Sequence, residues 1–130
     1  MNQAAMKQYQ TIGVQSGVTD ASSHQLISML MAGALDRMAS ARGAIIRGEI
    51  SRKGELLSEI IAIIDSLRAS LDHSRGGEIS TNLTSLYDYI EQCLLRANLD
   101  SDVEPLDEVS SLLAEIKAGW ELIPVDARRA

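Results

Sequence analysis

Apolar residues recur at three- and four-residue intervals in four long stretches of this 130-residue chain, and short breaks rich in glycine, proline and acidic residues separate the stretches. This spacing places apolar side chains on one face of an α-helix. The first stretch begins at Ser22, which forms a capping-box pattern with Gln25, and Gly48 ends it. The pattern predicts four amphipathic helices.

The breaks between the stretches indicate where the later helices begin and end. The second stretch begins at Ser51, and the later breaks are the run Ser74-Arg75-Gly76-Gly77, the acidic turn Asp100-Ser101-Asp102 and Pro124. Paired glycines terminate helices, and proline does not continue one. Asp102 can cap the fourth helix, and Pro105 is tolerated in the first turn, where backbone N–H groups lack helical acceptors. Four helices therefore follow a lead-in over residues 1–20.

The four helices and their short connections define the predicted fold. Amphipathic helices joined in this way form antiparallel bundles, so we expect an all-α, up-down four-helix bundle over residues 22–123. The lead-in at residues 1–20 ends in poor helix formers and is expected to lie extended over the domain as an N-terminal lid or cap, and residues 124–130 are expected to form a tail. We expect one domain, because 130 residues suffice for a single core.

Charge is unevenly distributed along the chain. Residues 1–53 carry six Lys/Arg and three Asp/Glu, whereas residues 54–130 carry six and fifteen. Nucleic-acid backbones are bound by clustered Lys and Arg, so this acidity argues against a nucleic-acid partner. No apolar run reaches the roughly 20 residues that span a bilayer, and the N-terminus lacks the pattern of a signal peptide. We therefore expect a cytoplasmic protein that does not insert into membranes.

Residues that could carry out catalysis or bind a metal are few. Cys93 is the only cysteine, and His24 and His73 lack the Glu-x-x-His spacing of di-iron bundles. The pair Gly76-Gly77 lacks the lysine and the preceding strand of a phosphate-binding loop. The sequence therefore predicts no enzyme, no metal site and no cofactor. One alternative is a phosphotransfer bundle that uses His24, a role that needs an exposed imidazole.

The first two predicted helices carry more apolar residues than one buried face requires. In the first helix, Ile27, Met31 and Leu35 form a second row beside the main apolar face. Such a row could fill the core of a central helix, or it could line a groove that accepts a helix of a partner protein. A third alternative is a self-associating structural bundle that buries these residues in a homodimer.

Several stretches, in the same order along the chain, carry a family resemblance. They are Tyr9 with Val14 and Val18, the run from Ala21 to Leu35, Leu67-Arg68-Ala69-Ser70-Leu71-Asp72, Gly76-Gly77-Glu78-Ile79, Asn82-Leu83, Leu86-Tyr87-Asp88-Tyr89, Leu95-Arg96-Ala97-Asn98-Leu99, Leu106-Asp107-Glu108-Val109 and Ala118-Gly119-Trp120. Together they resemble the flagellar secretion chaperone family, the flagellin-specific export chaperones called FliS. The chain departs from the family pattern at Ser23, Met31 and Ala32, where proline, an aromatic residue and aspartate are usual.

The resemblance implies a chaperone that binds the disordered C-terminal segment of flagellin, prevents its premature polymerisation and assists its delivery to the flagellar type III secretion apparatus. It leaves open whether export-gate components or an anti-sigma factor also bind. The client-binding residues that we predict are Met6, Tyr9 and Ile12 in the lid, Ile27 and Met31 in the first helix, and Tyr87 and Tyr89 in the third. Because Tyr87 and Tyr89 are two positions apart on a helix, they cannot face the same way.

Overall fold

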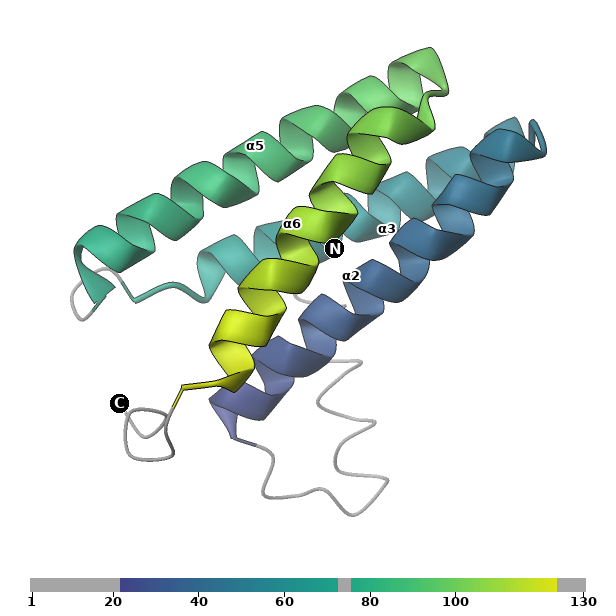
Figure 1. The fold of residues 1–130 in the computed structure, drawn as a ribbon. Coiled ribbons are helices and arrows are strands. Elements are labelled where there is room, and N and C mark those ends of the chain that lie inside the picture. Colours follow the sequence, from purple (N-terminus) through teal and green to yellow (C-terminus); the bar gives the residue numbers. More distant parts are fainter. Residues whose placement is uncertain (1–21, 73–75, 124–130) are drawn as a thin grey trace.

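A computed structural model describes residues 22–72 and 76–123, and within these ranges the chain forms four helices. They are α2 (Ser23–Ile46), α3 (Ile50–Ala69), α5 (Glu78–Asp100) and α6 (Val103–Glu121). The helices form an antiparallel up-down bundle, as Figure 1 shows. The predicted all-α four-helix bundle is confirmed.

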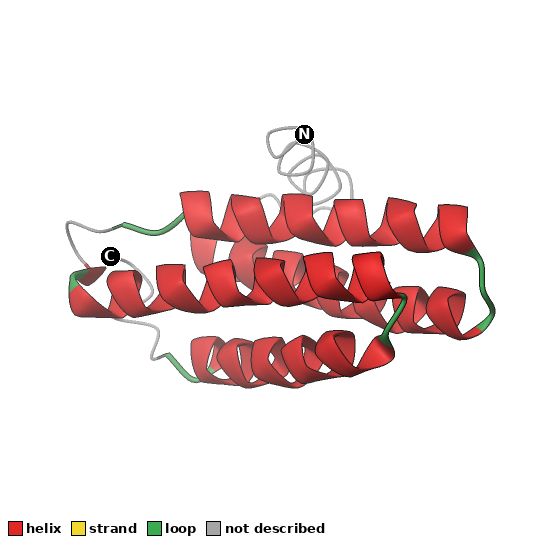
Figure 2. Ribbon diagram, turned by 90° about the horizontal axis from the view of Figure 1, so that it is seen from above, coloured by secondary structure: helices red, strands yellow, loops and turns green. Residues whose placement is uncertain are grey.

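The bundle consists of two helical hairpins, α2–α3 and α5–α6, packed against each other. α2 contacts α3 and α6, and α5 contacts α3 and α6, so the four helices form a ring around one core. The short turns between α2 and α3 and between α5 and α6 lie at the same end of the bundle (Figures 1 and 2), which we call the turn end. α2 begins and α6 finishes at the opposite end.

Local sequence explains where three of the helix ends lie. The backbone N–H of Gln25 donates to Ser22 Oγ at 3.2 Å, and the backbone N–H of Ser22 donates to Gln25 Oε1 at 2.9 Å, which is the predicted capping box. Asp102 caps α6 by accepting a hydrogen bond from the backbone N–H of Glu104 at 3.0 Å. After α2, Gly48 has a φ of +71°, a conformation that glycine adopts without steric cost.

Two helices are shorter than the sequence indicated. α3 ends at Ala69, before the predicted break at residues 74–77, and Leu71 beyond its end still packs against the core. α6 ends at Glu121, although the apolar pattern extends to Ile123. Pro124 explains the second difference, because the residue before a proline is disfavoured in helical conformation. The apolar periodicity therefore located the helices better than it located their ends.

The core is built from aliphatic side chains and one tyrosine. The largest side chains that are fully buried are Leu30, Met31, Met38, Leu57, Ile60, Ile64, Leu67, Tyr87, Ile90, Leu94, Leu106 and Leu113. Ala34, Ala41, Ala44 and Ala97 are also completely buried, and their small side chains allow neighbouring helices to approach closely. None of the described helices has the length and apolar character needed to cross a bilayer.

Candidate protein-binding surfaces

The second apolar row of α2 lies largely inside the bundle. Met31 is 1% exposed and Ile27 is 9% exposed, while Leu35 is half-buried and packs against the core. α2 is contacted on both flanks, by α3 and by α6, so it can bury a wider apolar face than one stripe. Of the two interpretations of this row, the structure therefore favours core packing. The lid residues Met6, Tyr9 and Ile12 lie outside the described residues.

Tyr87 and Tyr89 point to different environments, as their spacing on one helix requires. Tyr87 is buried in the core, and burial raises its pKa to about 12. Tyr89 is 40% exposed, and its hydroxyl donates to the carboxylate of Glu108 on α6 at 2.8 Å. This hydrogen bond is the main reason that the pKa of Tyr89 is raised to about 12. Tyr89 is thus the predicted contact residue that the described structure leaves accessible.

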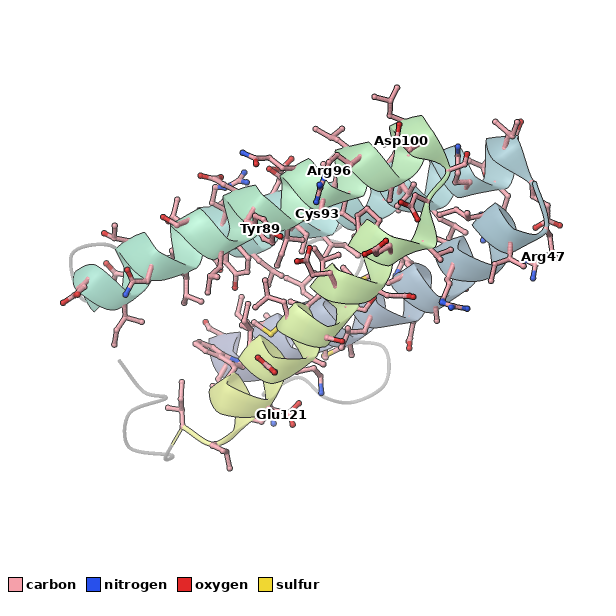
Figure 3. All side chains as sticks on the ribbon, turned by 45° about the horizontal axis from the view of Figure 1, so that its top comes forward. Arg47, Tyr89, Cys93, Arg96, Asp100 and Glu121 are labelled. Carbon is pink, nitrogen blue, oxygen red and sulfur yellow. The ribbon has the colours of Figure 1, made fainter. Side chains whose placement is uncertain are left out.

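A chain of polar contacts continues from Tyr89 along α5. Figure 3 shows Tyr89, Cys93 and Arg96 following one another on this helix. The Cys93 thiol is buried and lies 3.5 Å from a carboxylate oxygen of Glu108, and the Arg96 guanidinium donates to Cys93 Sγ at 3.3 Å. Each of these polar groups therefore has a structural partner, and Cys93 is a core residue.

His24 and Trp120 fasten the start of α2 to the end of α6. Their rings stack with centroids 4.6 Å apart. The Trp120 indole N–H donates to the His24 carbonyl oxygen at 3.0 Å, and His24 Nε2 lies 2.7 Å from the Trp120 carbonyl oxygen. His24 is only 5% exposed. A buried, stacked and hydrogen-bonded imidazole does not meet the requirement of the phosphotransfer alternative.

A buried lysine joins the two hairpins at the turn end. Lys53 of α3 is 6% exposed, and its ammonium group donates to the Asn98 carbonyl oxygen at 2.9 Å and to Ser101 Oγ at 2.7 Å. These acceptors lie in the last turn of α5 and just beyond it, where helical carbonyl groups lack partners and carry partial negative charge. Lys53 therefore acts as a cap supplied by another helix, a role that sequence reasoning missed.

One arginine holds three carboxylates at the contact between α3 and α5. The Arg68 guanidinium forms ion pairs with Asp65 at 2.7 Å, with Asp88 at 2.9 Å, and with Glu91. Burial raises the pKa of Glu91 to about 7, helped by a hydrogen bond with Asp65 and opposed by the Arg68 charge. A protonated Glu91 can therefore share a proton with Asp65 near neutral pH. This cluster of three carboxylates around Arg68 is therefore a packing contact between α3 and α5.

Four of the large apolar side chains that remain exposed lie at or near the turn end. Ile46 (63% exposed) and Ile50 (72%) flank the turn between α2 and α3, and Leu95 (58%) and Leu99 (85%) lie in the last two turns of α5. Sequence reasoning missed all four as surface residues. For two of them the sequence did contain an indication. Leu95 and Leu99 fall outside the apolar stripe of α5, which is formed by Tyr87, Ile90, Leu94 and Ala97.

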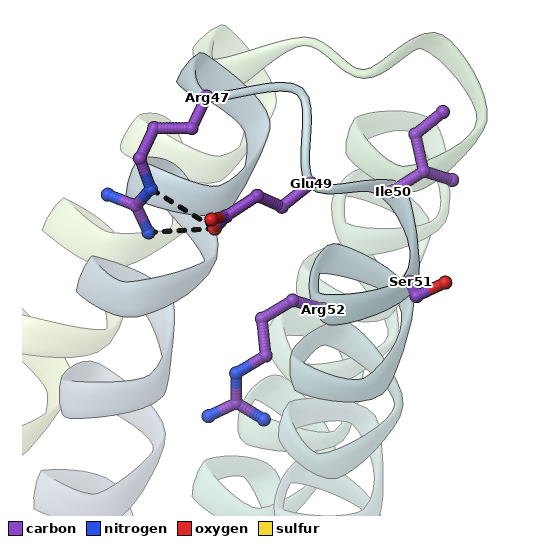
Figure 4. A pocket seen from close by; sticks show the side chains of 5 residues that line it. All are labelled: Arg47, Glu49, Ile50, Ser51 and Arg52. Atoms are coloured by element: carbon purple, nitrogen blue, oxygen red, sulfur yellow. Dashed lines mark hydrogen bonds and ion pairs between the residues drawn. The ribbon is translucent and has the colours of Figure 1, made fainter.

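The turn between α2 and α3 also borders an open hollow. Figure 4 shows its lining, which is Arg47, Glu49, Ile50, Ser51 and Arg52. The Arg47 guanidinium pairs with the Glu49 carboxylate at 3.0 Å, and Arg52 pairs with Glu55 at 3.1 Å. Over residues 22–72 and 76–123 no three His, Cys, Asp or Glu side chains are grouped so that they could hold a metal ion. The hollow is therefore lined by two ion-paired arginines and the exposed side chain of Ile50.

Comparisons with known proteins show one family to which the chain is similar over most of its length. Residues 5–127 match the model of one protein family, described as flagellar protein FliS. The chain is 50% identical over 117 residues to the flagellar secretion chaperone FliSB of Pseudomonas aeruginosa, covering 90% of this chain and 93% of the relative. It is 46% identical over 121 residues to the flagellar secretion chaperone FliS of Salmonella typhimurium, and 31% identical over 107 residues to that of Bacillus subtilis. These alignments cover 90% and 79% of the two relatives and 92% and 82% of this chain.

Proposed function

The chain belongs to the FliS family of flagellar secretion chaperones, and from this premise we propose that it binds the disordered C-terminal segment of flagellin in the cytoplasm. Binding keeps flagellin from polymerising before export and assists its delivery to the flagellar type III secretion apparatus. The family match over residues 5–127 is the observation that carries this proposal. The relatives that match are named as secretion chaperones, which supports a binding function over an enzymatic one.

The proposed client is a disordered segment, and a bundle of helices is suited to bind such a segment. A disordered segment can wrap a large surface when it folds on binding, and it gives up part of the interaction energy as ordering entropy. A bundle of helices offers such a segment apolar strips at helical spacing. The described bundle leaves seven large apolar side chains exposed, and most of them lie at helix ends or beside a turn.

The proposed client contacts follow the residues predicted from the sequence. Met6, Tyr9 and Ile12 belong to the lid, which joins the described bundle at Ser22, where α2 begins. Ile27 and Met31 lie in the first turns of the same helix, and Ile27 is at the margin of the core. Because the row packs between α3 and α6, we infer that Ile27, at its margin, meets the client directly and that Met31 contributes through the packing of α2.

Tyr87 and Tyr89 take different parts in the proposed site. Tyr89 is 40% exposed and holds its hydroxyl at Glu108, so it presents a ring edge and a hydrogen-bonding group to a client. Tyrosines of this kind are enriched among the residues that dominate binding energy. Tyr87 is buried beneath, and its proposed contribution is to hold the position of α5.

The proposal is tested by calorimetric titration of the protein with a synthetic peptide of the flagellin C-terminal segment. We expect a one-to-one complex and a gain in helical circular dichroism above the sum of the components. Tyr89→Ala should weaken binding about tenfold, as for a central interface tyrosine. Leu122→Ala, which also changes an exposed side chain (82%), is the matched control and should stay within about twofold. A flat titration with the wild-type protein would contradict the proposal.

A further inference from the structure

Two polar contacts between α3 and α5 show which sides of these helices meet. Arg68 of α3 pairs with Asp88 of α5 at 2.9 Å and also with Glu91. Nearer the turn end, the ammonium group of Lys53 donates to the Asn98 carbonyl oxygen at 2.9 Å. The side chain of Asp88 is 55% exposed. The pair of Arg68 and Asp88 therefore marks the outer side of the contact between α3 and α5.

Two isoleucines of α3 lie on the side of the helix that carries Arg68. Ile50 and Ile61 precede Arg68 by 18 and 7 residues, which correspond to five and about two helical turns. Ile50 is 72% exposed, and Ile61 is half-buried and packs against the core. Gly54, one turn after Ile50, has open space where a side chain would stand. α3 therefore presents an apolar surface beside α5 that is open above Gly54.

Two leucines of α5 lie on the side of the helix that carries Asp88. Leu95 and Leu99 follow Asp88 by 7 and 11 residues, which correspond to about two and three helical turns. Both are exposed, and both lie between Glu91 and Ser101, the two places where α5 binds side chains of α3. The outer side of the contact between α3 and α5 therefore carries apolar side chains from both helices.

These residues form one surface, which we call the α3–α5 strip (Ile50, Ile61, Leu95, Leu99 and Asp88). Its apolar part lies toward the turn end, and Asp88 lies about 10 Å from Leu95 along α5, the length of seven helical residues. At this charged end, Arg68 is one cation among three carboxyl groups, those of Asp65, Asp88 and Glu91. The strip therefore joins an apolar surface to a place where negative charge exceeds positive charge.

The charge of the two hairpins adds to this local excess. Over residues 23–69, which form α2, α3 and their turn, there are six Lys/Arg and five Asp/Glu, a net charge of +1. Over residues 78–121, which form α5, α6 and their turn, there are two Lys/Arg and ten Asp/Glu, a net charge of −8. A partner that approaches the strip therefore meets a negative potential, which favours a cationic segment.

We propose that the α3–α5 strip docks an amphipathic helix of a second protein, and that this helix carries a lysine or arginine about two turns from its apolar contact residues. The apolar side of the incoming helix covers Ile50, Leu95 and Leu99, and its cation pairs with Asp88. The distance between Leu95 and Asp88 along α5 sets the spacing that the partner must carry. The strip therefore selects its partner by the relative position of apolar and cationic residues.

The area and the charge of the strip decide against a second copy of this chain as the occupant. Three exposed aliphatic side chains offer on the order of 300 Å² of apolar surface, whereas each partner in a stable complex buries about 800 Å². Two copies would also bring together two chains of net charge −6, and like charges across an interface cost affinity. A single helix needs only a few apolar anchors at helical spacing, which the strip provides.

The strip is separate from the proposed client contacts. On α5, Tyr89 faces α6 and lies about a quarter to a third of a turn around the helix from Leu95 and Leu99. On α3, Glu59 pairs with α2 and is nine residues, or two and a half turns, from Arg68, so α2 lies on the opposite side of α3 from the strip. The helix partner is therefore additional to the client, and the proposal does not depend on client binding.

The test measures the fluorescence anisotropy of fluorescein-labelled 18-residue peptides with the full-length protein. The lysine peptide is an alanine–glutamine helix with a row of leucines and, two turns beyond them on the same side, one lysine. It is made in both sequence orders, because a helix can lie on the strip in either direction. We expect one order to bind, and to bind about fivefold more weakly at low salt when the lysine is moved to the opposite side. Absence of binding in both orders would overturn the proposal.

One pair of variants tests the apolar part of the strip. Leu95→Gln/Leu99→Gln should weaken binding of the lysine peptide at least about tenfold, because two apolar contacts are lost. Ile79→Gln/Leu122→Gln is the matched control, since it also changes two exposed apolar side chains, which lie at the opposite end of the bundle, and it should change binding less than about twofold. Equal losses in the two double variants would contradict the proposed surface.

A second pair of variants tests the charged end. Asp88→Asn should weaken binding of the lysine peptide about threefold to fivefold at low salt, and should not affect a peptide in which glutamine replaces the lysine. Glu115→Gln removes one negative charge from α6, away from the strip, and should change binding of the lysine peptide less than about 1.5-fold. If Asp88→Asn weakened both peptides equally, or no more than Glu115→Gln, Asp88 would not pair with the lysine and the proposal would fail.

Competition and sedimentation test the other occupants. The lysine peptide should bind with unchanged affinity when the protein is saturated with the flagellin C-terminal peptide. Displacement would overturn the proposal, since the strip would then belong to the client site while flagellin binding itself stood. Sedimentation of the protein alone should show no dimer that Leu95→Gln/Leu99→Gln abolishes. Such a dimer would assign the strip to self-association instead.

Discussion

The α2–α3 and α5–α6 hairpins share one architecture but differ in what they expose. In both, aliphatic residues at helical spacing fill a common core, and a short turn joins the helices at the same end. The α2–α3 hairpin has balanced charge and paired arginines, whereas the α5–α6 hairpin has a net charge of −8 and carries Leu95 and Leu99 on its outer side. The difference teaches that core packing fixes the fold while leaving the charge and the exposed side chains of each hairpin free to differ.

The comparison depends on the contacts that hold the hairpins together, and the buried Lys53 makes two of these. Lys53→Ala should lower the free energy of unfolding by about 2–3 kcal/mol, because it leaves the Asn98 carbonyl and the Ser101 hydroxyl without their donor. Chemical denaturation measures this loss. Arg52→Ala, which removes an exposed pair in the same helix, is the control and should cost no more than about 1 kcal/mol. Equal effects would mean that Lys53 does not join the hairpins.

The contact at the opposite end should have the next largest effect. Trp120→Ala removes the stacking on His24 and the hydrogen bond to its carbonyl oxygen, and should cost about 2 kcal/mol. Trp120→Phe keeps a ring for stacking and loses only the hydrogen bond, so about half of the loss should return. Thermal unfolding of the two variants gives the comparison. If both variants were as stable as the wild type, the contact between His24 and Trp120 would not hold the hairpins together.

The contact between α3 and α5 should make stability depend on pH. The folded-state pKa of Glu91, about 7, lies above the unfolded value of about 4.3, so the folded protein keeps a proton that the unfolded chain releases in this window. Stability from this group is therefore full below about pH 4 and is lost as pH rises through 7. After allowance for its partial exposure, we expect a loss of about 1–2 kcal/mol between pH 5 and pH 8.

Glu91→Gln isolates this effect, because glutamine stays neutral throughout. The difference in melting temperature between pH 5 and pH 8 should be smaller in the variant by about 3–6 °C, the shift that 1–2 kcal/mol produces in a domain of this size. Asp88→Asn, at a more exposed carboxylate of the same cluster, serves as the control and should retain most of the pH dependence. An unchanged pH profile in Glu91→Gln would show that this carboxyl group is ionised in the folded protein.

The smallest effect is expected within the α5–α6 hairpin itself. Tyr89→Phe removes an exposed hydrogen bond to Glu108, with which water competes, and should change the melting temperature less than any of the variants above. Glu108→Gln should lower the pKa of Tyr89 from about 12 toward its ordinary value of about 10, since the carboxylate that accepts the phenol hydrogen bond is lost. Ultraviolet titration in a Tyr9→Phe/Tyr87→Phe background, in which Tyr89 is the one tyrosine left, measures this change. A Tyr89 pKa that Glu108→Gln leaves unchanged would indicate that the contact does not persist in solution.

Much of the fold could be predicted from the sequence because its determinants are local. The capping box of Ser22 and Gln25 and the Asp102 cap involve residues two or three positions apart, and both are present as predicted. The sequence showed that the apolar face of α2 is wide. It could not show whether this face fills the core or lines a groove, because that depends on α3 and α6, which contact both flanks of α2. The sequence predicted α3 and α6 to extend beyond Ala69 and Glu121, because the apolar periodicity continues past these residues.

The contacts between hairpins could not be predicted, because they join residues far apart in the chain. Lys53 and Asn98 are 45 positions apart, and His24 and Trp120 are 96 apart, with no local pattern that relates them. The acidic half of the sequence was visible from composition. The exposure of Leu95 and Leu99 was not, because it becomes clear only when the buried face of α5 is fixed by the neighbouring helices.

The most direct measurement of the proposed chaperone function is light scattering during flagellin polymerisation. Purified flagellin is induced to polymerise with and without an equimolar amount of this protein, and a flagellin that lacks its C-terminal segment serves as the control for binding. We predict that the protein keeps full-length flagellin monomeric and does not bind the truncated form. Polymerisation at the same rate with and without the protein would contradict the proposed function.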